Sequence, residues 1–373
     1  MASRKDAPVI VAALRTPIGT AGKALASVDA AHLAASVLAR VGADLPAPAD
    51  VVLGNCTGPG GDVARVATLA AGLPDTVPAV TVDRQCGSGL AAVELGAALV
   101  RERDAVVLAG GVESASTAPW RFWPPADGAA PRRYQRAPFS PEPETDPDMG
   151  LAADLLAEEA GVSRARQDAY AARSHQRAWA AIESGRFGDE IVPVAGISRD
   201  QRPRPGMTPD RLGRLPAAFR EGGSVTAGNS CGISDGAAVV AIAPASTQLP
   251  GLRVLATASA GVDPRRPGIG LVPAVTRALK YAALRLGDID VIELNEAFAG
   301  QVLACCDALA LDPERVCRQG GALALGHPWG ASGAVLVVRL FTQMVREGSG
   351  RFGLAAIAVG GGQGVAMVVE ACR

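Results

Sequence analysis

The sequence of 373 residues lacks an excess of charge of either sign, because 36 Lys and Arg oppose 37 Asp and Glu, giving a formal net charge of −1. A balanced chain has no bulk electrostatic reason to bind nucleic acid or an anionic membrane surface. It also lacks any uninterrupted apolar run of about 18 residues, which a membrane-spanning helix needs. We therefore expect neither nucleic acid nor a membrane as a partner.

The seven cysteines are scattered and lack the paired spacing of a zinc site. Their odd number argues against a disulfide framework of the kind found in small secreted proteins. No hydrophobic signal segment follows the first residues, Met1 to Asp6. Together these features predict a reduced, cytoplasmic protein without a metal site.

Small and aliphatic side chains are abundant: 49% of the residues are hydrophobic and only 4% are aromatic. Apolar runs typical of buried strands alternate with alanine-rich runs typical of helices, which predicts an α/β fold with helices on both faces of a parallel sheet. A proline- and arginine-rich stretch from Glu113 to about Ser224 interrupts this alternation. It predicts an insertion of loops and short helices, and long loops inside a compact domain are usually functional.

Periodicity predicts the individual elements. The expected strands are 9–14, 50–54, 77–82, 105–111, 236–243, 253–260, 291–294, 354–359 and 365–371. The expected helices are 30–41, 64–71, 90–100, 151–159, 164–184, 271–286, 300–309 and 331–345, with Ser163 as an N-cap and a glycine-rich turn at 320–328. Early and late in the chain, a small-residue turn is followed by a helix and a strand that ends in Gly-Gly, which suggests a duplication.

Cys86 lies where an expected strand becomes an expected helix, in the stretch Asp83-Arg84-Gln85-Cys86-Gly87-Ser88-Gly89-Leu90. Backbone N–H groups and the positive end of a helix stabilise a thiolate at such a turn. The glycines allow a substrate and the backbone to approach closely. The alternative is a small buried hydrophobe, which is a common role for a free cysteine.

Three further candidates follow expected strands or turns: Asn295, His327 and the glycine run that begins at Gly360. Ligands bind at strand ends in α/β sheets. A cysteine and a histidine from different segments suggest an activated thiolate, while Asn295 and the glycine N–H groups suggest oxyanion stabilisation. The set predicts acyl transfer through a thioester. The alternative for His327 is a histidine that is simply satisfied by the backbone.

Over nearly its whole length, the sequence resembles the thiolases, a family of acyl-CoA acyltransferases that includes acetyl-CoA acetyltransferases and 3-ketoacyl-CoA thiolases. Long motifs in the family's order carry the resemblance: Arg15-Thr16-Pro17-Ile18-Gly19, Cys86-Gly87-Ser88-Gly89-Leu90, Gly110-Gly111-Val112-Glu113-Ser114, Thr226-Ala227-Gly228-Asn229, Asp235-Gly236-Ala237-Ala238, Asn295-Glu296-Ala297-Phe298-Ala299, the stretch 320–328 ending in Gly326-His327-Pro328, and the stretch 360–367.

The resemblance implies a duplicated, five-layered αβαβα thiolase fold with an inserted loop domain that binds coenzyme A. The halves would be 1–112 with 225–250, and 251–373, with the insertion at 113–224. It also implies a coenzyme A thioester as substrate, no permanently bound cofactor, and a homodimer or homotetramer.

Site residues carry over from the family to matching positions. Cys86 would accept the acyl group, and His327 would activate it and contribute to one oxyanion hole, with a water held by Asn295. The backbone N–H groups of Cys86 and Gly360 would form a second hole. Residues matched to the coenzyme A and acyl channel are Met149, Arg204, Phe219, Ala227, Gly228 and Cys231.

The sequence departs from the thiolase pattern at Ala358, where the family has a second cysteine that acts as acid and base at the substrate α-carbon. A methyl group can neither remove nor return a proton. We therefore expect Claisen condensation and its reverse to be impaired, whereas acylation of Cys86 is not. Nearby, Asp148 replaces a common histidine, Cys231 a usual serine, and Trp329 a smaller apolar residue.

Three functions stay open on the sequence. The first is a thiolase-like enzyme that passes the acyl group from Cys86 to an acceptor needing no carbanion generation, such as an amine, alcohol, thiol, water or an already activated carbon nucleophile. The second is an ordinary acetyl-CoA C-acyltransferase with a substitute base, for which Cys231 is a candidate. The third is a non-catalytic scaffold that binds coenzyme A.

Overall fold

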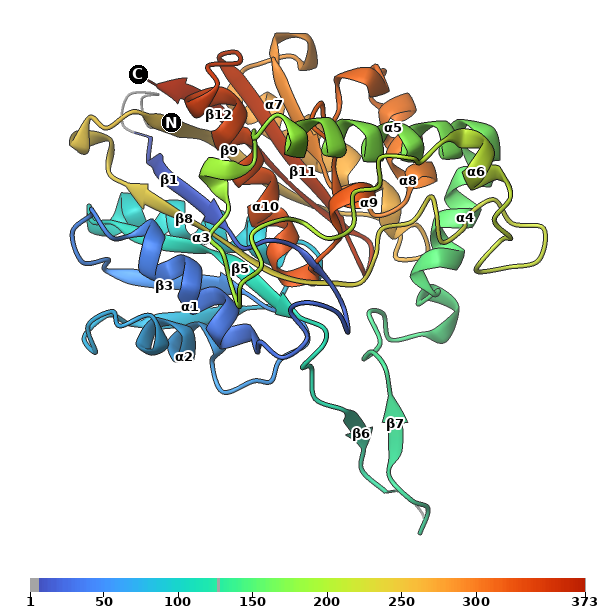
Figure 1. The fold of residues 1–373 in the computed structure, drawn as a ribbon, viewed down its shortest axis with the longest axis horizontal. Coiled ribbons are helices and arrows are strands. Elements are labelled where there is room, and N and C mark those ends of the chain that lie inside the picture. The colour runs from blue at the N-terminus through green and yellow to red at the C-terminus, as the bar shows by residue number, and fades with distance from the viewer. Residues whose placement is uncertain (1–6, 126–127, 373) are drawn as a thin grey trace.

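The structure is a computed structural model that describes residues 7–125 and 128–372. Residues 1–6, where the sequence predicts no signal segment, lie outside this range. The ribbon contains two sheets that continue into each other and an insertion that extends away from them (Figure 1). No described helix is long and apolar enough to cross a membrane.

The first half of the chain forms a mixed sheet with strand order β4-β3-β5-β8-β1. β3 pairs in parallel with both β4 and β5, whereas β8 pairs antiparallel with β5 and β1. The strands are β1 (Val9–Arg15), β2 (Gly19–Thr20, paired with β8), β3 (Asp50–Gly54), β4 (Ala79–Val82), β5 (Val107–Ser114) and β8 (Ser234–Ala243).

The second half repeats this pattern with strand order β10-β11-β12-β9. β10 and β11 are parallel, β12 is antiparallel to β11 and β9, and a parallel bridge from Ile292 to Val316 takes the place of β4. The sheets join where β9 pairs with β1. The matching order and directions confirm the predicted duplication. The strands are β9 (Gly251–Gly261), β10 (Val291–Leu294), β11 (Phe352–Val359) and β12 (Gln363–Cys372).

Helices separate and cover the two sheets, which gives the five layers expected from the resemblance. α1 and α2 cover the first sheet, α7 and α8 cover the second, and α3 and α10 lie between them in contact with both. All of α10 except its first residue is buried, as a central helix requires. The bounds are α1 (Ala30–Val41), α2 (Val63–Ala70), α3 (Ser88–Arg103), α7 (Leu271–Ala282), α8 (Ala299–Ala308), α9 (Ala322–Leu325) and α10 (Trp329–Phe341).

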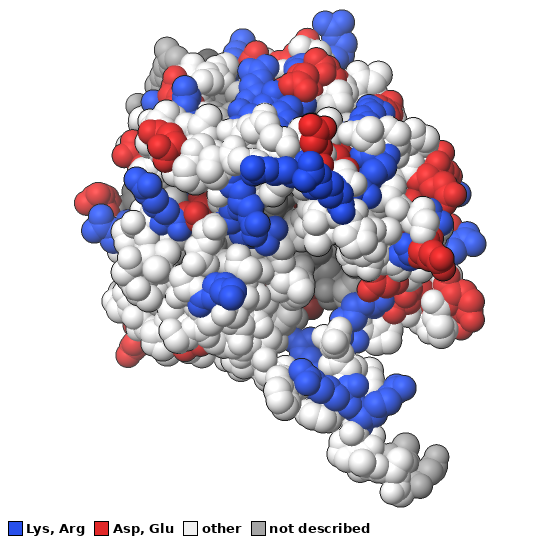
Figure 2. All heavy atoms as spheres, turned by 45° about the vertical axis from the view of Figure 1, so that its right-hand side comes forward, with Lys and Arg blue, Asp and Glu red and all other residues white. Residues whose placement is uncertain are grey.

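The insertion between β5 and β8 contains more structure than the sequence predicted. A hairpin of β6 (Arg121–Trp123) and β7 (Arg132–Tyr134) projects from the body (Figure 1), held by ring stacking of Trp123 on Tyr134 at 4.6 Å. Lys and Arg side chains gather on this projection (Figure 2). The helices are α4 (Met149–Glu159), α5 (Arg164–Glu183, capped by Ser163 as predicted) and α6 (Pro209–Gly213). The domain limits themselves stay a prediction.

Apart from 30–41, 50–54 and 291–294, the predicted bounds differ from those of the structure by one to three residues at one end or both, and three stretches differ further. The turn at 320–328 contains the short helix α9. The helix predicted at 271–286 ends at Ala282 because Ala283 is left-handed, with φ 52°. The helix predicted at 331–345 continues past α10 as a π-helical turn, Thr342–Arg346. Short 3-10 helices lie at Pro143–Thr145, Gly188–Glu190, Ala245–Thr247, Pro267–Ile269, Leu286–Asp288 and Pro313–Arg315.

Candidate functional site

Cys86 lies in the turn between β4 and α3, directly before the helix N-cap Gly87. The turn is fixed by Ser88, whose hydroxyl donates to the Gln85 carbonyl at 2.6 Å and accepts from the Arg84 N–H at 2.8 Å. A Cβ atom at Gly87 would lie 2.7 Å from Val359 Cγ2. Glycine at 87 therefore allows the end of β11, from the second half of the chain, to approach Cys86.

A pocket of about 590 Å³ brings Cys86 together with residues from the second half and the insertion. It contains six of the positions singled out in the sequence as reactive or altered: Cys86, Cys231, His327, Trp329, Ala358 and Gly360. The full lining is Cys86, Met149, Ala152, Ala153, Cys231, Pro267, Gly268, Ala297, Phe298, Gln301, His327, Trp329, Ala358, Val359 and Gly360.

The electrostatics at Cys86 differ from the sequence expectation of a stabilised thiolate. Burial raises the pKa of the Cys86 thiol to about 12, and the Glu113 carboxylate adds to this. The backbone N–H groups of Cys86 and Gly360 act in the expected direction and lower the pKa, but burial outweighs them. The resting group is therefore the thiol, and a base must take its proton when it reacts.

His327 is a buried, neutral imidazole whose hydrogen bonds fix its tautomer. Its Nδ1 lies 2.6 Å from Ser332 Oγ, and the Ser332 hydroxyl donates to the Pro328 carbonyl at 2.9 Å. The hydrogen-bond network therefore assigns the hydrogen to Nδ1 and leaves Nε2 as the basic nitrogen. Burial lowers the pKa of His327 to about 4, which keeps the ring uncharged.

Asn295 directly follows β10 and lies against His327, with 3.5 Å between Asn295 Nδ2 and His327 Nε2. The next residue, Glu296, fixes this loop to the insertion. Its buried carboxylate accepts hydrogen bonds from the Tyr170 and Ser174 hydroxyls, at 2.9 Å and 2.6 Å. The helix α5 of the insertion thus helps to position a loop of the second half.

Two of the residues matched to the substrate channel, Met149 and Cys231, line the pocket with Cys86. Phe219 does not line the pocket itself but packs against a residue that does. Its ring lies edge-on to the ring of Phe298, with 6.0 Å between the two ring centroids. The Phe219 ring also covers Gly150, where a Cβ atom would lie 2.1 Å from it. Met149, Cys231 and Phe298 therefore lie in the wall of the pocket that holds Cys86, and Phe219 packs behind Phe298.

Arg204, Ala227 and Gly228 do not line the pocket. Arg204 and Ala227 are exposed, and Gly228 is partly buried beneath Leu212 of α6 and Leu215, which follows that helix. The charge of Arg204 acts on His175, whose pKa is lowered to about 4 by burial and by the neighbouring arginines. These three residues stay predictions as coenzyme A contacts.

The departures from the thiolase pattern have different structural settings. Ala358 and Trp329 lie in the pocket wall, and Cys231 is the other pocket cysteine, with its pKa raised to about 12 by burial. Asp148 instead caps α4, accepting from the Gly150 and Leu151 N–H groups at 2.9 Å and 3.4 Å. Among the described residues, no group of three or more His, Cys, Asp or Glu could hold a metal ion.

The chain is similar to known proteins over almost its whole length. The family models "Thiolase, N-terminal domain" and "Thiolase, C-terminal domain" match residues 8–246 and 249–371. An acetyl-CoA acetyltransferase of Pseudomonas aeruginosa is 44% identical over 388 residues, with 97% of this chain and 98% of the relative covered. A beta-ketoadipyl-CoA thiolase of the same organism is 43% identical over 393 residues, with 96% and 97% covered.

Two solved structures are also similar. The Bacillus anthracis acetyl-CoA acetyltransferase superposes with a TM-score of 0.93 at 38% identity, covering 98% of this chain and 99% of that one. The human mitochondrial 3-ketoacyl-CoA thiolase superposes with a TM-score of 0.91 at 34% identity, covering 100% of both. By sequence and by fold, the chain belongs to the thiolase family.

Proposed function

We propose that this chain is a thiolase-type acyl-CoA acyltransferase that carries the acyl group as a thioester on Cys86. The observation that supports this most directly is the shared pocket of Cys86 and His327, with the N–H groups of Cys86 and Gly360 directed at the sulfur. Acyl-CoA transfer agrees with the printed names of the relatives, an acetyl-CoA acetyltransferase and a beta-ketoadipyl-CoA thiolase.

In the proposed acylation, His327 Nε2 takes the Cys86 proton as the sulfur attacks the thioester carbonyl of the substrate. The tetrahedral oxyanion would accept hydrogen bonds from one pair of donors, either His327 with a water on Asn295 or the two backbone N–H groups. When the intermediate collapses, coenzyme A leaves as its thiol and Cys86 keeps the acyl group.

The second half-reaction is where this chain differs from its family. A pocket wall with Ala358 offers no acid or base at that position. We therefore propose that the acceptor is a heteroatom nucleophile or a carbon nucleophile that arrives already activated, and that carbanion generation from a second acyl-CoA is weak.

The second candidate is ordinary Claisen condensation or thiolysis with a substitute base. It is favoured by the relatives named acetyl-CoA acetyltransferase at 42–44% identity and by the presence of Cys231 in the same pocket. The rate of acetoacetyl-CoA cleavage by coenzyme A tests this second function. The variant Cys231→Ser removes the thiol that would act as the substitute base. Full activity in that variant would exclude Cys231 from the role.

Intact-protein mass spectrometry after mixing with a panel of acyl-CoAs tests the main proposal. We expect a mass gain of one acyl group on the wild type and none on Cys86→Ala. No gain with any acyl-CoA, or an equal gain on both proteins, would overturn it. A homodimer or homotetramer and a cytoplasmic location stay predictions, and light scattering coupled to size exclusion tests the first.

A further inference from the structure

A second cavity lies between β10 and α10, lined by Pro328, the residue after His327, and by Ser332, the partner of its Nδ1. It leaves about 20 Å³ for the centres of water molecules, and about 10–15 Å³ of such space is enough for one water. Every residue that lines it is buried. The lining is Ile18, Glu293, Asn295, Gly320, Gly321, Ala322, Leu325, Gly326, Pro328, Ser332, Val335, Leu336 and Arg339.

Polar side chains in the wall of this cavity include one that contacts the His327 imidazole. Glu293 and Asn295 are two residues apart along the β10 segment and so share one face, while Ser332 and Arg339 lie seven residues apart on one face of α10. Ser332 Oγ contacts His327 Nδ1 at 2.6 Å. Buried Arg339 Nε has no hydrogen-bond partner. A water in this cavity would therefore find both donors and acceptors.

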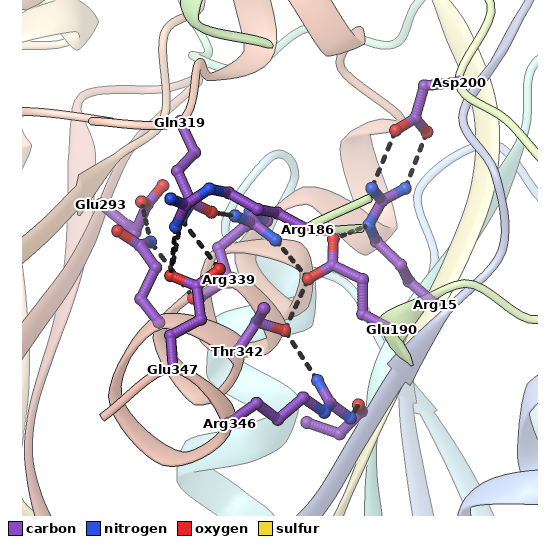
Figure 3. Close-up of polar contacts among 12 residues, drawn as sticks. Arg15, Arg186, Glu190, Asp200, Glu293, Gln319, Arg339, Thr342, Arg346 and Glu347 are labelled. Carbon is purple, nitrogen blue, oxygen red and sulfur yellow. Dashed lines mark hydrogen bonds and ion pairs between the residues drawn. The ribbon is translucent and has the colours of Figure 1, made fainter. Parts of the chain in front are cut away.

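Glu293 belongs to a buried polar network that Figure 3 shows. Its carboxylate accepts from Gln343 Nε2 at 2.6 Å. The titratable groups facing it are Arg339 of α10, Glu296 of the loop after β10, and Cys317. Burial raises the pKa of Glu293 to about 7, with Arg339 acting against this and Glu296 adding to it. Arg339 also forms an ion pair with Glu190, and elsewhere in the network the Gln319 side chain donates a hydrogen bond to the Glu347 carboxylate.

We propose that Glu293 is the proton acceptor behind His327, connected to Ser332 by water held in this cavity. The Cys86 S–H bond breaks and its proton moves to His327 Nε2. The Nδ1 proton moves to Ser332 Oγ. The Ser332 hydroxyl turns from the Pro328 carbonyl to the water and gives it its proton, and a water proton moves to the Glu293 carboxylate. Nothing is oxidised or reduced. The negative charge moves from Glu293 to the sulfur, and the stored proton returns when coenzyme A leaves as its thiol.

Electrostatics favours this route over transfer that stops at the imidazole. Transfer to His327 alone would create two new charges, imidazolium and thiolate, and burial disfavours both. Transfer onward to an ionised carboxylate moves one existing negative charge and creates no cation. The inference rests on the proposed role of Cys86 as nucleophile, and it makes Glu293 a positioning residue that acts through His327.

The test is the rate of Cys86 alkylation by iodoacetamide between pH 5 and 10, followed by peptide mass spectrometry in the full-length protein. The ionised form of Glu293 accepts the proton, so the wild-type rate should rise through a midpoint of about 7. Glu293→Gln should remove this rise and slow alkylation at pH 8 by about 10²-fold, the lower end of the contribution that positioned proton transfer makes. Glu347→Gln, a carboxylate of the same network outside the cavity, should keep the wild-type profile.

Ser332→Ala provides a second test, because it breaks the connection while Glu293 stays in place, and it should also remove the rise. A wild-type profile in a folded Glu293→Gln protein, or in Ser332→Ala if the first variant does not fold, overturns the inference. Alkylation does not need acyl-CoA. Loss of the proposed function would therefore appear as a missing acyl mass gain with the alkylation profile intact.

Discussion

Ala358 contributes only a methyl group to a pocket that also holds two cysteines and a histidine. The side chain is partly buried at the pocket wall, so a thiol added there would face the same space as Cys86. General acid–base groups contribute about 10²- to 10⁴-fold to proton-transfer steps. The absence of such a group at residue 358 therefore bears on the proposed carbon–carbon step and leaves the proposed acylation step with its proposed base, His327.

We predict that Ala358→Cys raises the rate of acetoacetyl-CoA cleavage by about 10²-fold or more, because it supplies the missing acid and base. The rate of Cys86 acylation should stay within about 3-fold of wild type. The substitution adds a single sulfur atom to the pocket wall, and such a small change in size costs little binding energy. Ala358→Ser, similar in size but poorly ionisable, is the matched control. A wild type that already cleaves acetoacetyl-CoA as fast as Ala358→Cys would contradict the prediction.

Two helices at the centre of the molecule, α3 and α10, approach closely through glycines. A Cβ atom at Gly89 would lie 2.8 Å from the Gly330 carbonyl oxygen, and one at Gly333 would lie 2.4 Å from the Leu90 nitrogen. These contacts are with backbone atoms, which cannot turn away as a side chain can. The helix that begins just after Cys86 is thereby fixed against the helix that begins just after His327.

We predict that Gly89→Ala and Gly333→Ala each lower the free energy of unfolding by about 1–3 kcal/mol or more, the cost of overpacking a core. Chemical denaturation followed by circular dichroism measures this. Gly287→Ala is the matched control, because a Cβ atom there meets nothing within 4 Å. Equal stability of the three variants would show that the helices can separate without cost.

The start of α4 depends on Asp148, one of the departures from the family pattern. We predict that Asp148→Ala lowers the free energy of unfolding by about 1 kcal/mol, because two N–H groups of the first turn lose their acceptor. Asp148→Asn keeps an acceptor oxygen and should lose less. Thermal unfolding of the two variants beside wild type gives the comparison, and an unchanged melting temperature in Asp148→Ala would argue against the cap.

At the scale of the whole molecule, buried charges connect the two halves and the insertion. Glu190 of the insertion accepts from Arg15 at the end of β1, at 2.8 Å, and pairs with Arg339 of α10. Arg15 also forms two hydrogen bonds with Asp200, at 2.7 Å and 2.8 Å. Figure 3 shows Glu190 between the two arginines. Removal of this carboxylate would leave two buried cations next to each other.

We predict that Glu190→Gln lowers the free energy of unfolding by about 3–5 kcal/mol, as breaking a buried pair does. Burial alone would raise the pKa of Glu190, but Arg339 and Arg15 lower it below its ordinary value. Its stabilisation is therefore present above the unfolded pKa of about 4.3 and lost as pH falls through the lower folded value. Glu183→Gln, an exposed neighbour, should change stability by less than about 0.5 kcal/mol.

The local pattern of apolar and polar residues was sufficient to predict many of the helices and strands and to single out Cys86 as the candidate nucleophile. The bounds predicted for 30–41, 50–54 and 291–294 agree with α1, β3 and β10, because each segment has a clear apolar pattern between polar or glycine residues that mark its ends. Structure that depends on contacts between residues farther apart in the chain was harder to predict. The β6–β7 hairpin was missed because its strands have three residues each and are held by one ring pair and cross-strand contacts.

The sequence by itself determined the family, the duplicated layers, the strand-to-helix turn at Cys86 and the alanine at 358, because each of these follows from contiguous residues. Only the tertiary structure decided which channel residues share the pocket with Cys86 and that the resting group is a thiol. It alone revealed the buried cavity lined by Glu293, Asn295 and Ser332. Burial and the contacts of residues far apart in the chain set these properties, and neither is encoded in any single stretch of sequence.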